Sequence, residues 1–302
     1  MTPKAERTTT TDSHQDSDDS GSRLPELWTR TLGELTLSYV PDSGVAMIPG
    51  RVYPSVAAEE WSGHQAHMTH AGHLSVGCGA LLVERGATRL LIDAGHGRIS
   101  GEVEHFQHAF SHVRDLPGSL AALGVAPGEL EMVAFTHFHG DHTGWARPEA
   151  CEDPRGLFTK ARWMVGEGEL ESVPTEAGPV LAGQSERAVV VPDGAEIADG
   201  VRAWSLSGHT PGHTAWLLET GDGRQVVAFG DAMHSPVQAE HPDWEVLLDN
   251  DRKEAERSRR RLVEHLARDG VLGFGVHFAD QQLGTVGRSG RWLPWPDETA
   301  QH

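Results

Sequence analysis

Residues 137–142 place four potential metal ligands within six positions, namely His137, His139, Asp141 and His142. They follow directly on an apolar run, residues 130–136, which predicts a buried strand. His137 and His139 lie two apart, so an extended backbone projects both to one side, whereas Asp141 and His142 begin a turn or helix and point elsewhere. One segment can therefore serve two adjacent metal ions.

Three further apolar segments lead into residues of the same ligand types. Residues 201–206 precede a Gly-His-Thr-Pro-Gly-His stretch, residues 226–229 precede Gly-Asp, and residues 271–276 precede one more histidine. The residues concerned are His209, His213, Asp231 and His277. Imidazole and carboxylate groups that sit repeatedly at strand ends are expected to converge at one edge of a sheet. Their nitrogen and oxygen atoms suit zinc.

The combined pattern resembles that of the metallo-β-lactamase-fold superfamily. The match is His137-x-His139-x-Asp141-His142 followed in order by His213, Asp231 and His277, over roughly residues 31–293. The resemblance implies an α/β fold, a four-layer αββα sandwich with the metal site at the sheet edge. Residues 1–23 are rich in Thr, Ser and Asp and predict a disordered acidic tail. Residues 24–302 are then expected to form a single hydrolase domain.

The resemblance also assigns a role to each ligand-type residue. The ligands it implies are His137, His139 and His213 for a first zinc ion, Asp141, His142 and His277 for a second, and Asp231 as the bridge between both. Within the Gly-His-Thr-Pro-Gly-His stretch it favours His213 as the ligand, with His209 supporting the site from outside the ligand set. Asp93, in Leu-Ile-Asp-Ala-Gly, matches an acidic residue that orients a ligand imidazole.

Hydrolysis is the chemistry expected of such a pair of ions. Two zinc ions about 3.5–4 Å apart can share a hydroxide, because each lowers the pKa of bound water towards about 7. That hydroxide is the expected nucleophile, and Asp141 is expected to hydrogen-bond it and pass on its proton. The sequence has no Gly-x-Ser-x-Gly nucleophile motif. The superfamily's diiron, oxygen-reducing branch typically has a glutamate where His139 stands, so this chain keeps the hydrolytic pattern.

Two segments resemble the quorum-quenching lactonase and methyl parathion hydrolase branch: Gly-Asp-Ala-Met-His-Ser-Pro at residues 230–236, and residues 277–292. The lactonases carry a tyrosine three residues after the bridging aspartate, where it contacts the substrate carbonyl. His234 stands at that position here, and its imidazole can donate to an oxyanion or simply fill the pocket rim. Asp141 and His234 are therefore the predicted catalytic residues.

The sequence thus predicts a binuclear zinc-dependent hydrolase that acts on an ester, a lactone or a related bond of a small-molecule substrate. A thioesterase, a cyclase or a carrier-protein-interacting member of a biosynthetic pathway is the alternative, and an organophosphate hydrolase or iron-dependent oxidoreductase a more distant one. The formal net charge of −19 argues against a nucleic-acid partner, because Lys and Arg clusters hold phosphate backbones. No run approaches the roughly 20 apolar residues of a membrane span.

Two cysteines without ligand spacing, Cys78 and Cys151, fit a cytoplasmic protein. A homodimer is the expected assembly, since it is the commonest one among soluble enzymes.

The remaining elements follow from alternation, turn residues and helical periodicity. The predicted strands cover residues 32–40, 74–84, 88–92, 161–165, 188–191, 215–219 and 225–229, and the first is expected to end at turn residues 41–44. The predicted helices cover residues 119–123, 167–173 and 252–268. Residues 98–116 are expected to form a helix or a flap.

Three further groups of side chains can be interpreted either as ordinary structural residues or as functional ones. His64, His67, His70 and His73 recur every third residue and are interpreted as a histidine-rich loop rather than a separate metal site. The arginines at 257, 259, 260 and 261 predict a solvated helix face. The candidates for an apolar pocket, each more simply explained by ordinary packing, are Phe106, Phe110, Phe138, Trp145, His234 and Phe278.

Overall fold

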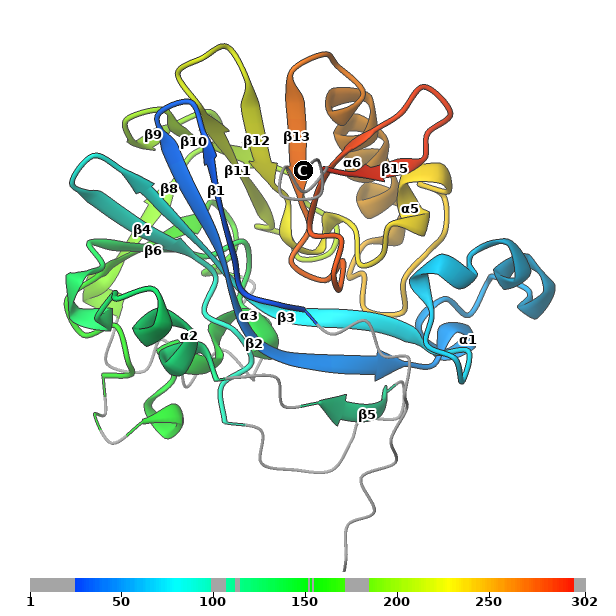
Figure 1. Cartoon of the computed structure of the whole chain (residues 1–302), viewed down its shortest axis with the longest axis horizontal. Helices are drawn as coiled ribbons and strands as arrows, with labels where there is room; N and C mark the ends of the chain where they lie inside the picture. The colour runs from blue at the N-terminus through cyan, green and yellow to red at the C-terminus, as the bar shows by residue number, and fades with distance from the viewer. Residues whose placement is uncertain are drawn as a thin grey trace, which may run out of the picture.

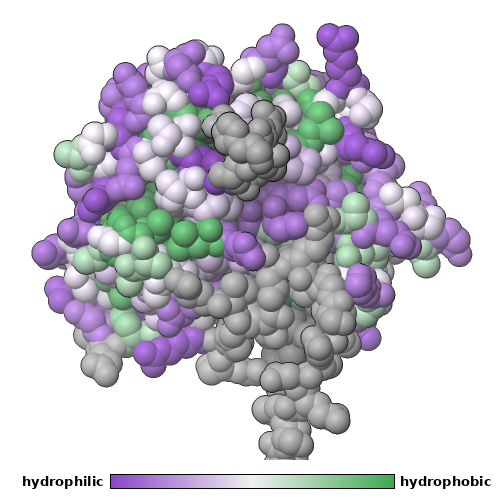
Figure 2. Space-filling view, viewed as in Figure 1, coloured by the Kyte–Doolittle hydropathy of each residue, from purple (hydrophilic) through white to green (hydrophobic). Residues whose placement is uncertain are grey.

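Two β-sheets packed face to face form the centre of the computed structural model (Figure 1). The structure describes residues 25–98, 107–111, 115–151, 153, 155–171 and 185–295. The predicted tail, residues 1–23, lies outside this part of the chain. Hydrophilic residues predominate among the coloured atoms on the face seen in Figure 2. No helix within the described ranges is long and apolar enough to cross a membrane.

The first sheet begins as an antiparallel meander and continues as parallel strands. Its order is β1 (Trp28–Leu32), β2 (Leu35–Met47), β3 (Leu74–Arg85), β4 (Thr88–Ile92), β6 (Met132–Ala134), β7 (Arg162–Gly166) and β8 (Ala188–Val191), and β5 (Gln107–Ser111) pairs with β2. Neighbours from β1 to β4 are antiparallel, and those from β4 to β8 are parallel. The strands predicted over residues 74–84 and 88–92 are confirmed as β3 and β4, which pair as a hairpin.

The second sheet is antiparallel apart from one pair. Its order is β15 (Trp292–Pro294), β14 (Leu283–Val286), β13 (Val271–Phe274), β12 (Gln225–Ala228), β11 (Thr214–Glu219), β10 (Val201–Ser205) and β9 (Glu196–Ala198). Only β12 and β13 run parallel. The strands predicted before the Gly-His, Gly-Asp and His277 segments are confirmed as β10, β12 and β13.

Short helices and one long helix connect the strands. The α-helices are α1 (Pro49–Val52), α2 (Leu116–Ala122), α3 (Gly140–Thr143), α5 (Val237–Glu240) and α6 (Arg252–Leu266). The 3₁₀ helices are η1 (Ala58–Gly63), η2 (Gln65–His67), η3 (Pro127–Glu129), η4 (Gly144–Ala146), η5 (Pro148–Ala150), η6 (Ser185–Arg187) and η7 (Gly230–Ala232). The predicted helix over residues 252–268 is confirmed as α6, whose N-cap Asp251 accepts a hydrogen bond from the Glu254 amide.

Three apolar clusters separate four layers. The central one joins both sheets, with Leu37 and Leu81 from the first packed against Trp216 and Phe274 from the second. Helix α2 covers the outer face of the first sheet, and α6 covers that of the second through Leu262 and its neighbours (Figure 1). The αββα sandwich expected from the resemblance is therefore confirmed.

The turn predicted at residues 41–44 is wrong, because β2 runs through it to Met47. The pairing of β2 with β3 shifts register between Pro41 and Ser43, as in a β-bulge, which accommodates a proline without a backbone N–H. Asp42 is buried in this bulge and accepts hydrogen bonds from three backbone amides and from Trp145 Nε1. Distant partners thus override the local preference for a turn.

The helix predicted over residues 167–173 is wrong in its described part, because residues 167–171 form a turn. A Cβ atom on Gly212 would lie only 2.1 Å from the Glu169 backbone nitrogen, so this turn packs directly on the segment before β11. Of the segment 98–116, residues 107–111 form β5, and α2 begins at Leu116, earlier than predicted. Most of the predicted helix or flap lies outside the described residues.

Candidate metal centre

The strand ends that carry ligand-type residues meet at one edge of the sandwich. From the first sheet, β6 leads to His137 and His139, and α3 carries Asp141 and His142. From the second sheet, β10, β12 and β13 lead to the segments that carry His209, His213, Asp231 and His277. All of these side chains are buried except those of His139 and Asp141, which are half-buried. The site therefore lies where the two sheets meet.

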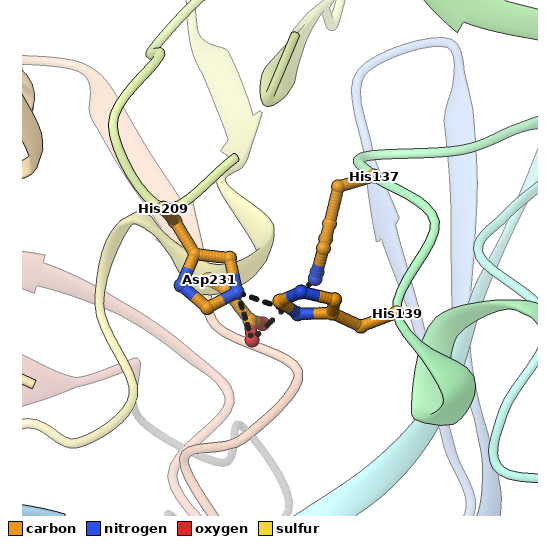
Figure 3. A group of neighbouring side chains, drawn as sticks. All are labelled: His137, His139, His209 and Asp231. Carbon is orange, nitrogen blue, oxygen red and sulfur yellow. Dashed lines mark hydrogen bonds and ion pairs between the residues drawn. The ribbon is translucent and has the colours of Figure 1, made fainter. Parts of the chain in front are cut away.

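Four side chains form a first group of donors: His137, His139, His209 and Asp231. Their ligand atoms lie within 4.8 Å of one another and point towards a common centre (Figure 3). His209 Nε2 lies 2.9 Å from His139 Nδ1 and 3.3 Å from Asp231 Oδ2. His137 Nε2 lies 3.7 Å from the same oxygen. Three imidazole nitrogens with a carboxylate oxygen are a donor set that zinc binds.

A second group consists of His142, His277 and Asp231, with Asp141 beside it. The Nε2 atoms of His142 and His277 lie 3.2 Å apart, and they are 3.0 Å and 2.9 Å from Asp231 Oδ1. Asp141 Oδ2 lies 3.5 Å from His277 Nε2. The two oxygens of Asp231 thus face different groups, Oδ2 the first and Oδ1 the second.

The spacing of these atoms fits metal ions. Donors that bind one zinc ion at about 2.0–2.2 Å lie roughly 3–4 Å from one another. The separations given above run from 2.9 Å to 3.7 Å, and all donor atoms of each group lie within 4.8 Å of one another. His137 Nε2 is buried without a hydrogen-bond partner among the described residues. Such a buried nitrogen costs free energy, and a bound cation would remove that cost.

The structure places His209, and not His213, in the first group, whereas the resemblance implied His213 as the ligand. His213 is fully buried, and its Nε2 accepts a hydrogen bond from the Asp231 backbone N–H at 3.0 Å. That contact occupies the lone pair that a metal would need. The Nε2 of His209 faces His139 and Asp231 instead, so His209 is the proposed ligand.

Buried acceptors orient three of the ligand imidazoles through Nδ1. The pairs are His209 with Asp249 Oδ1 at 3.1 Å, His142 with Asp93 Oδ2 at 2.9 Å, and His277 with the Gly77 carbonyl at 2.7 Å. When Nδ1–H donates to these oxygens, the Nε2 lone pair is left facing the donor group. The contact of Asp93 agrees with the orienting role predicted for it.

Asp93 adopts a backbone conformation that is rare outside glycine, with φ of +63°. Its Oδ1 accepts a hydrogen bond from the Thr136 backbone N–H at 2.7 Å, and its Oδ2 binds Thr136 Oγ1 at 2.9 Å. These bonds offset the strain, and they lock the residue that precedes His137. Strain of this kind is typical of residues that hold a functional site.

Arg259 corrects the prediction of a solvated basic helix face. Its side chain is fully buried, and its guanidinium donates to Asp249 Oδ2 at 3.1 Å and to the Pro242 carbonyl at 2.9 Å. Arg259 shares the inner face of α6 with Leu262 and Leu266, three and seven residues on. Its neighbour Arg260, with 52% of its side chain exposed, pairs with Glu256 in solvent as predicted.

Burial and the mutual arrangement of charges set the protonation of the metal-free site. Burial lowers the pKa of His139 to about 4 and that of His213 to about 3. Burial acts in the same direction on His142 and His277, but the carboxylate of Asp231 outweighs it and raises both pKa values well above the usual range. The metal-free site therefore holds protons where a cation would otherwise balance Asp231.

The sequence comparison gives the family. A family model described as the metallo-beta-lactamase superfamily matches residues 76–267, which is more than half of the chain. The chain belongs to the metallo-β-lactamase superfamily. This membership agrees with the αββα layers and with the His and Asp groups at the sheet edge, and it supports a metal-dependent hydrolase.

Several solved structures resemble the chain over most of its length. A hydrolase named AbOPH, of the beta lactamase superfamily, is 22% identical with a TM-score of 0.77, covering 91% of this chain and 99% of its own. AidC, a dizinc quorum-quenching lactonase, is 20% identical with a TM-score of 0.76 and the same coverage. A probable metal-dependent hydrolase from Staphylococcus aureus is 18% identical, with a TM-score of 0.72 over 89% of this chain and 99% of its own. At these identities the likeness shows the superfamily fold.

Glu169 joins two ligand-bearing segments and carries no signal in the sequence. Its buried carboxylate accepts hydrogen bonds from the Phe138 backbone N–H at 2.9 Å and from Thr210 Oγ1 at 2.6 Å. Burial raises the pKa of Glu169. Asp249 also carries no signal in the sequence, because its partner His209 lies 40 residues away. Neither residue belongs to a local motif that could have pointed to it.

The aromatic candidates for a pocket that the structure describes are core residues. Phe138 and Trp145 are buried in the outer core with α2, and Phe278 packs on Trp292 beneath α6. The side chains of Phe106 and Phe110 lie outside the described part. In that part, no group of three close donors includes a member of the 64-to-73 histidine series, and the histidine-rich loop stays a prediction.

Proposed function

We propose that this chain is a binuclear zinc-dependent hydrolase that opens an ester or lactone bond of a small molecule. The single observation that carries the proposal is the placement of Asp231, whose Oδ2 faces the first donor group while its Oδ1 faces the second. A carboxylate shared in this way is suited to two neighbouring ions. The proposed ligands are His137, His139 and His209 for the first ion, Asp141, His142 and His277 for the second, and Asp231 for both.

Zinc ions bound there would lower the pKa of a water molecule and polarise the substrate carbonyl. Asp141 is the most open acidic group of the centre, with 27% of its side chain exposed. Burial opposes its ionisation, but His142 and His277 hold the pKa of Asp141 at about 2. Asp141 is therefore ionised at neutral pH and can accept a proton from water and pass it to the leaving group.

His234 is the second proposed catalytic residue. It is buried at the site, and its Nε2 lies 3.1 Å from Asp231 Oδ2. Burial lowers the pKa of His234, so the ring is neutral at pH 7 and carries one N–H. Because Asp231 Oδ2 is a proposed ligand atom, the N–H of His234 is then left to donate to a developing oxyanion. The tyrosine of the lactonases would make a similar contact.

The names of similar structures favour a lactone or related acyl substrate. The AidC structure holds its product N-hexanoyl-L-homoserine, and a structure titled N-acyl homoserine lactone hydrolase holds the same product at its catalytic metal centre. Both proteins are named as enzymes that hydrolyse a lactone. The present chain departs from the lactonase pattern at His234, which is why esters and thioesters stand beside lactones as substrates to test.

A hydrolysis panel with site variants tests the proposal. The panel contains an acyl-homoserine lactone, an aryl ester, a thioester, a phosphotriester and a β-lactam. For the substrate that is turned over, Asp231→Asn and His139→Ala should each lower kcat/KM by at least about 100-fold, since each removes a donor. His70→Ala alters an exposed histidine outside the centre and should leave the rate unchanged. Full turnover by either site variant would contradict the assignment.

A further inference from the structure

A cysteine lies beside the second donor group. The ligand atoms of Cys78, Asp141 and His277 lie within 4.8 Å of one another. Cys78 is a free cysteine with only 1% of its surface exposed. It comes from β3, a strand that supplies none of the ligands proposed above. The sequence pattern gave no role to this residue.

Backbone contacts hold Gly77, the residue before Cys78, against His277. Gly77 O accepts from His277 Nδ1 at 2.7 Å, and the Gly77 N–H donates to the His277 carbonyl at 3.4 Å. A Cβ atom on Gly77 would lie 3.1 Å from the Val276 carbonyl oxygen, so only glycine allows β3 to come this close without a shift. The thiol that follows Gly77 is thereby held within 4.8 Å of a ring nitrogen of His277 and of a carboxylate oxygen of Asp141.

We propose that Cys78 is a further ligand of the second metal ion, which then has sulfur, nitrogen and oxygen donors. This inference rests on the proposed function. On binding, the S–H proton goes to solvent and a sulfur lone pair binds the cation, with no change of oxidation state. Thiolate ligands favour zinc, cobalt or cadmium over magnesium and manganese. Cys78 would therefore make the second site selective for softer cations.

The other role open to Cys78 is that of a small apolar side chain, because it also belongs to the apolar cluster with Val76, Val45 and Trp244. In that role the sulfur packs without binding an ion. The two roles predict different spectra for the cobalt-loaded protein. Cobalt bound by nitrogen and oxygen alone shows visible ligand-field bands, whereas a thiolate ligand adds a charge-transfer band in the near ultraviolet.

The experiment loads the full chain with Co²⁺ and compares wild type, Cys151→Ser and Cys78→Ser. Cys151 is half-buried and is the other cysteine of the chain, so its replacement is a matched control. We expect the near-ultraviolet band in wild type and Cys151→Ser and its loss in Cys78→Ser, with ligand-field bands retained in all three. The dissociation constant of one of the two ions should rise about 10-fold or more in Cys78→Ser alone.

The wild-type and Cys151→Ser spectra decide the question even if Cys78→Ser fails to fold, because a thiolate band in Cys151→Ser can come only from Cys78. Ligand-field bands without a near-ultraviolet band in these two proteins would overturn the role of Cys78 while leaving the proposed metal centre intact. Failure of the wild type to bind cobalt or zinc at all would overturn the proposed function and this inference with it.

Discussion

His209 and His213 lie four residues apart, and their surroundings give them different roles. Asp249 holds the His209 ring through Nδ1 while Nε2 faces the first donor group. His213 accepts the backbone N–H of Asp231 instead, so it positions the carboxylate that both groups share. Removal of a ligand and removal of a residue that positions a ligand should therefore have different consequences for metal content.

His209→Ala should reduce the metal content from two ions per chain to about one, because it deletes a donor of the first group. His213→Ala should keep two ions but weaken their binding by about 10–100-fold, because it loosens Asp231. Elemental analysis after dialysis gives the ion count, and competition with a chelator gives the affinity. The reverse pattern, with one ion in His213→Ala and two in His209→Ala, would return the ligand role to His213.

Local patterns predict the elements that carry the site, and distant contacts decide how they are used. Each ligand strand is a short apolar run followed by a polar residue, so β6, β10, β12 and β13 could be recognised within a few positions. The choice of His209 depends on Asp249, which lies 40 residues away, and the course of β2 through Pro41 depends on amides 54 to 74 residues away. No sequence window contains those partners.

In helix α6 too, the local sequence pattern predicts the element, while a distant contact decides how one of its residues is used. Its arginine run suggested one solvated face, yet Arg259 lies on the turn that faces the core and binds Asp249 there. Asp249 in turn orients His209, so the helix is connected to the metal centre through one buried ion pair. Burial raises the pKa of Asp249, but its hydrogen bond with His209 and the charge of Arg259 outweigh this effect and hold that pKa at about 2.

Arg259→Met should destabilise the protein by about 3–5 kcal/mol, because it leaves the Asp249 carboxylate buried without its cation. Arg260→Met, on the solvent side of the same helix, should change the free energy of unfolding by no more than about 0.5 kcal/mol. Denaturant titration of the metal-free proteins measures both. Equal effects of the two substitutions would show that the buried pair does not stabilise α6.

At the scale of the whole molecule, the centre joins the two sheets. The segments that follow β6 supply His137 to His142, and the second sheet supplies His209, Asp231 and His277. The apolar cluster between the sheets holds these two halves together. We propose that residues 24–302 form one domain for this reason. Metal binding should then be coupled to folding, because the donors come together only in the folded chain.

In the metal-free protein, one pair of histidines loses its stabilising contribution as the pH rises, and another pair loses it as the pH falls. His142 and His277 have raised pKa values when folded, so their stabilising contribution is present below about pH 6.5 and is lost as the pH rises through the folded values. His139 and His213 have pKa values of about 4 and about 3, so their contribution is present above about pH 6.5 and is lost as the pH falls. Both pairs favour stability near about pH 6.5.

Removal of metal should therefore lower Tm and make stability depend on pH with a maximum near about pH 6.5. Bound zinc takes the place of the protons near Asp231, so the loaded protein should not lose stability on the alkaline side. For each of the two sites, free zinc at about 100 times the dissociation constant should add about 2.7 kcal/mol. Thermal unfolding between about pH 5 and 9, with zinc or with a chelator, measures both effects. Identical Tm values in zinc and in chelator at every pH would mean that no ion binds the folded centre.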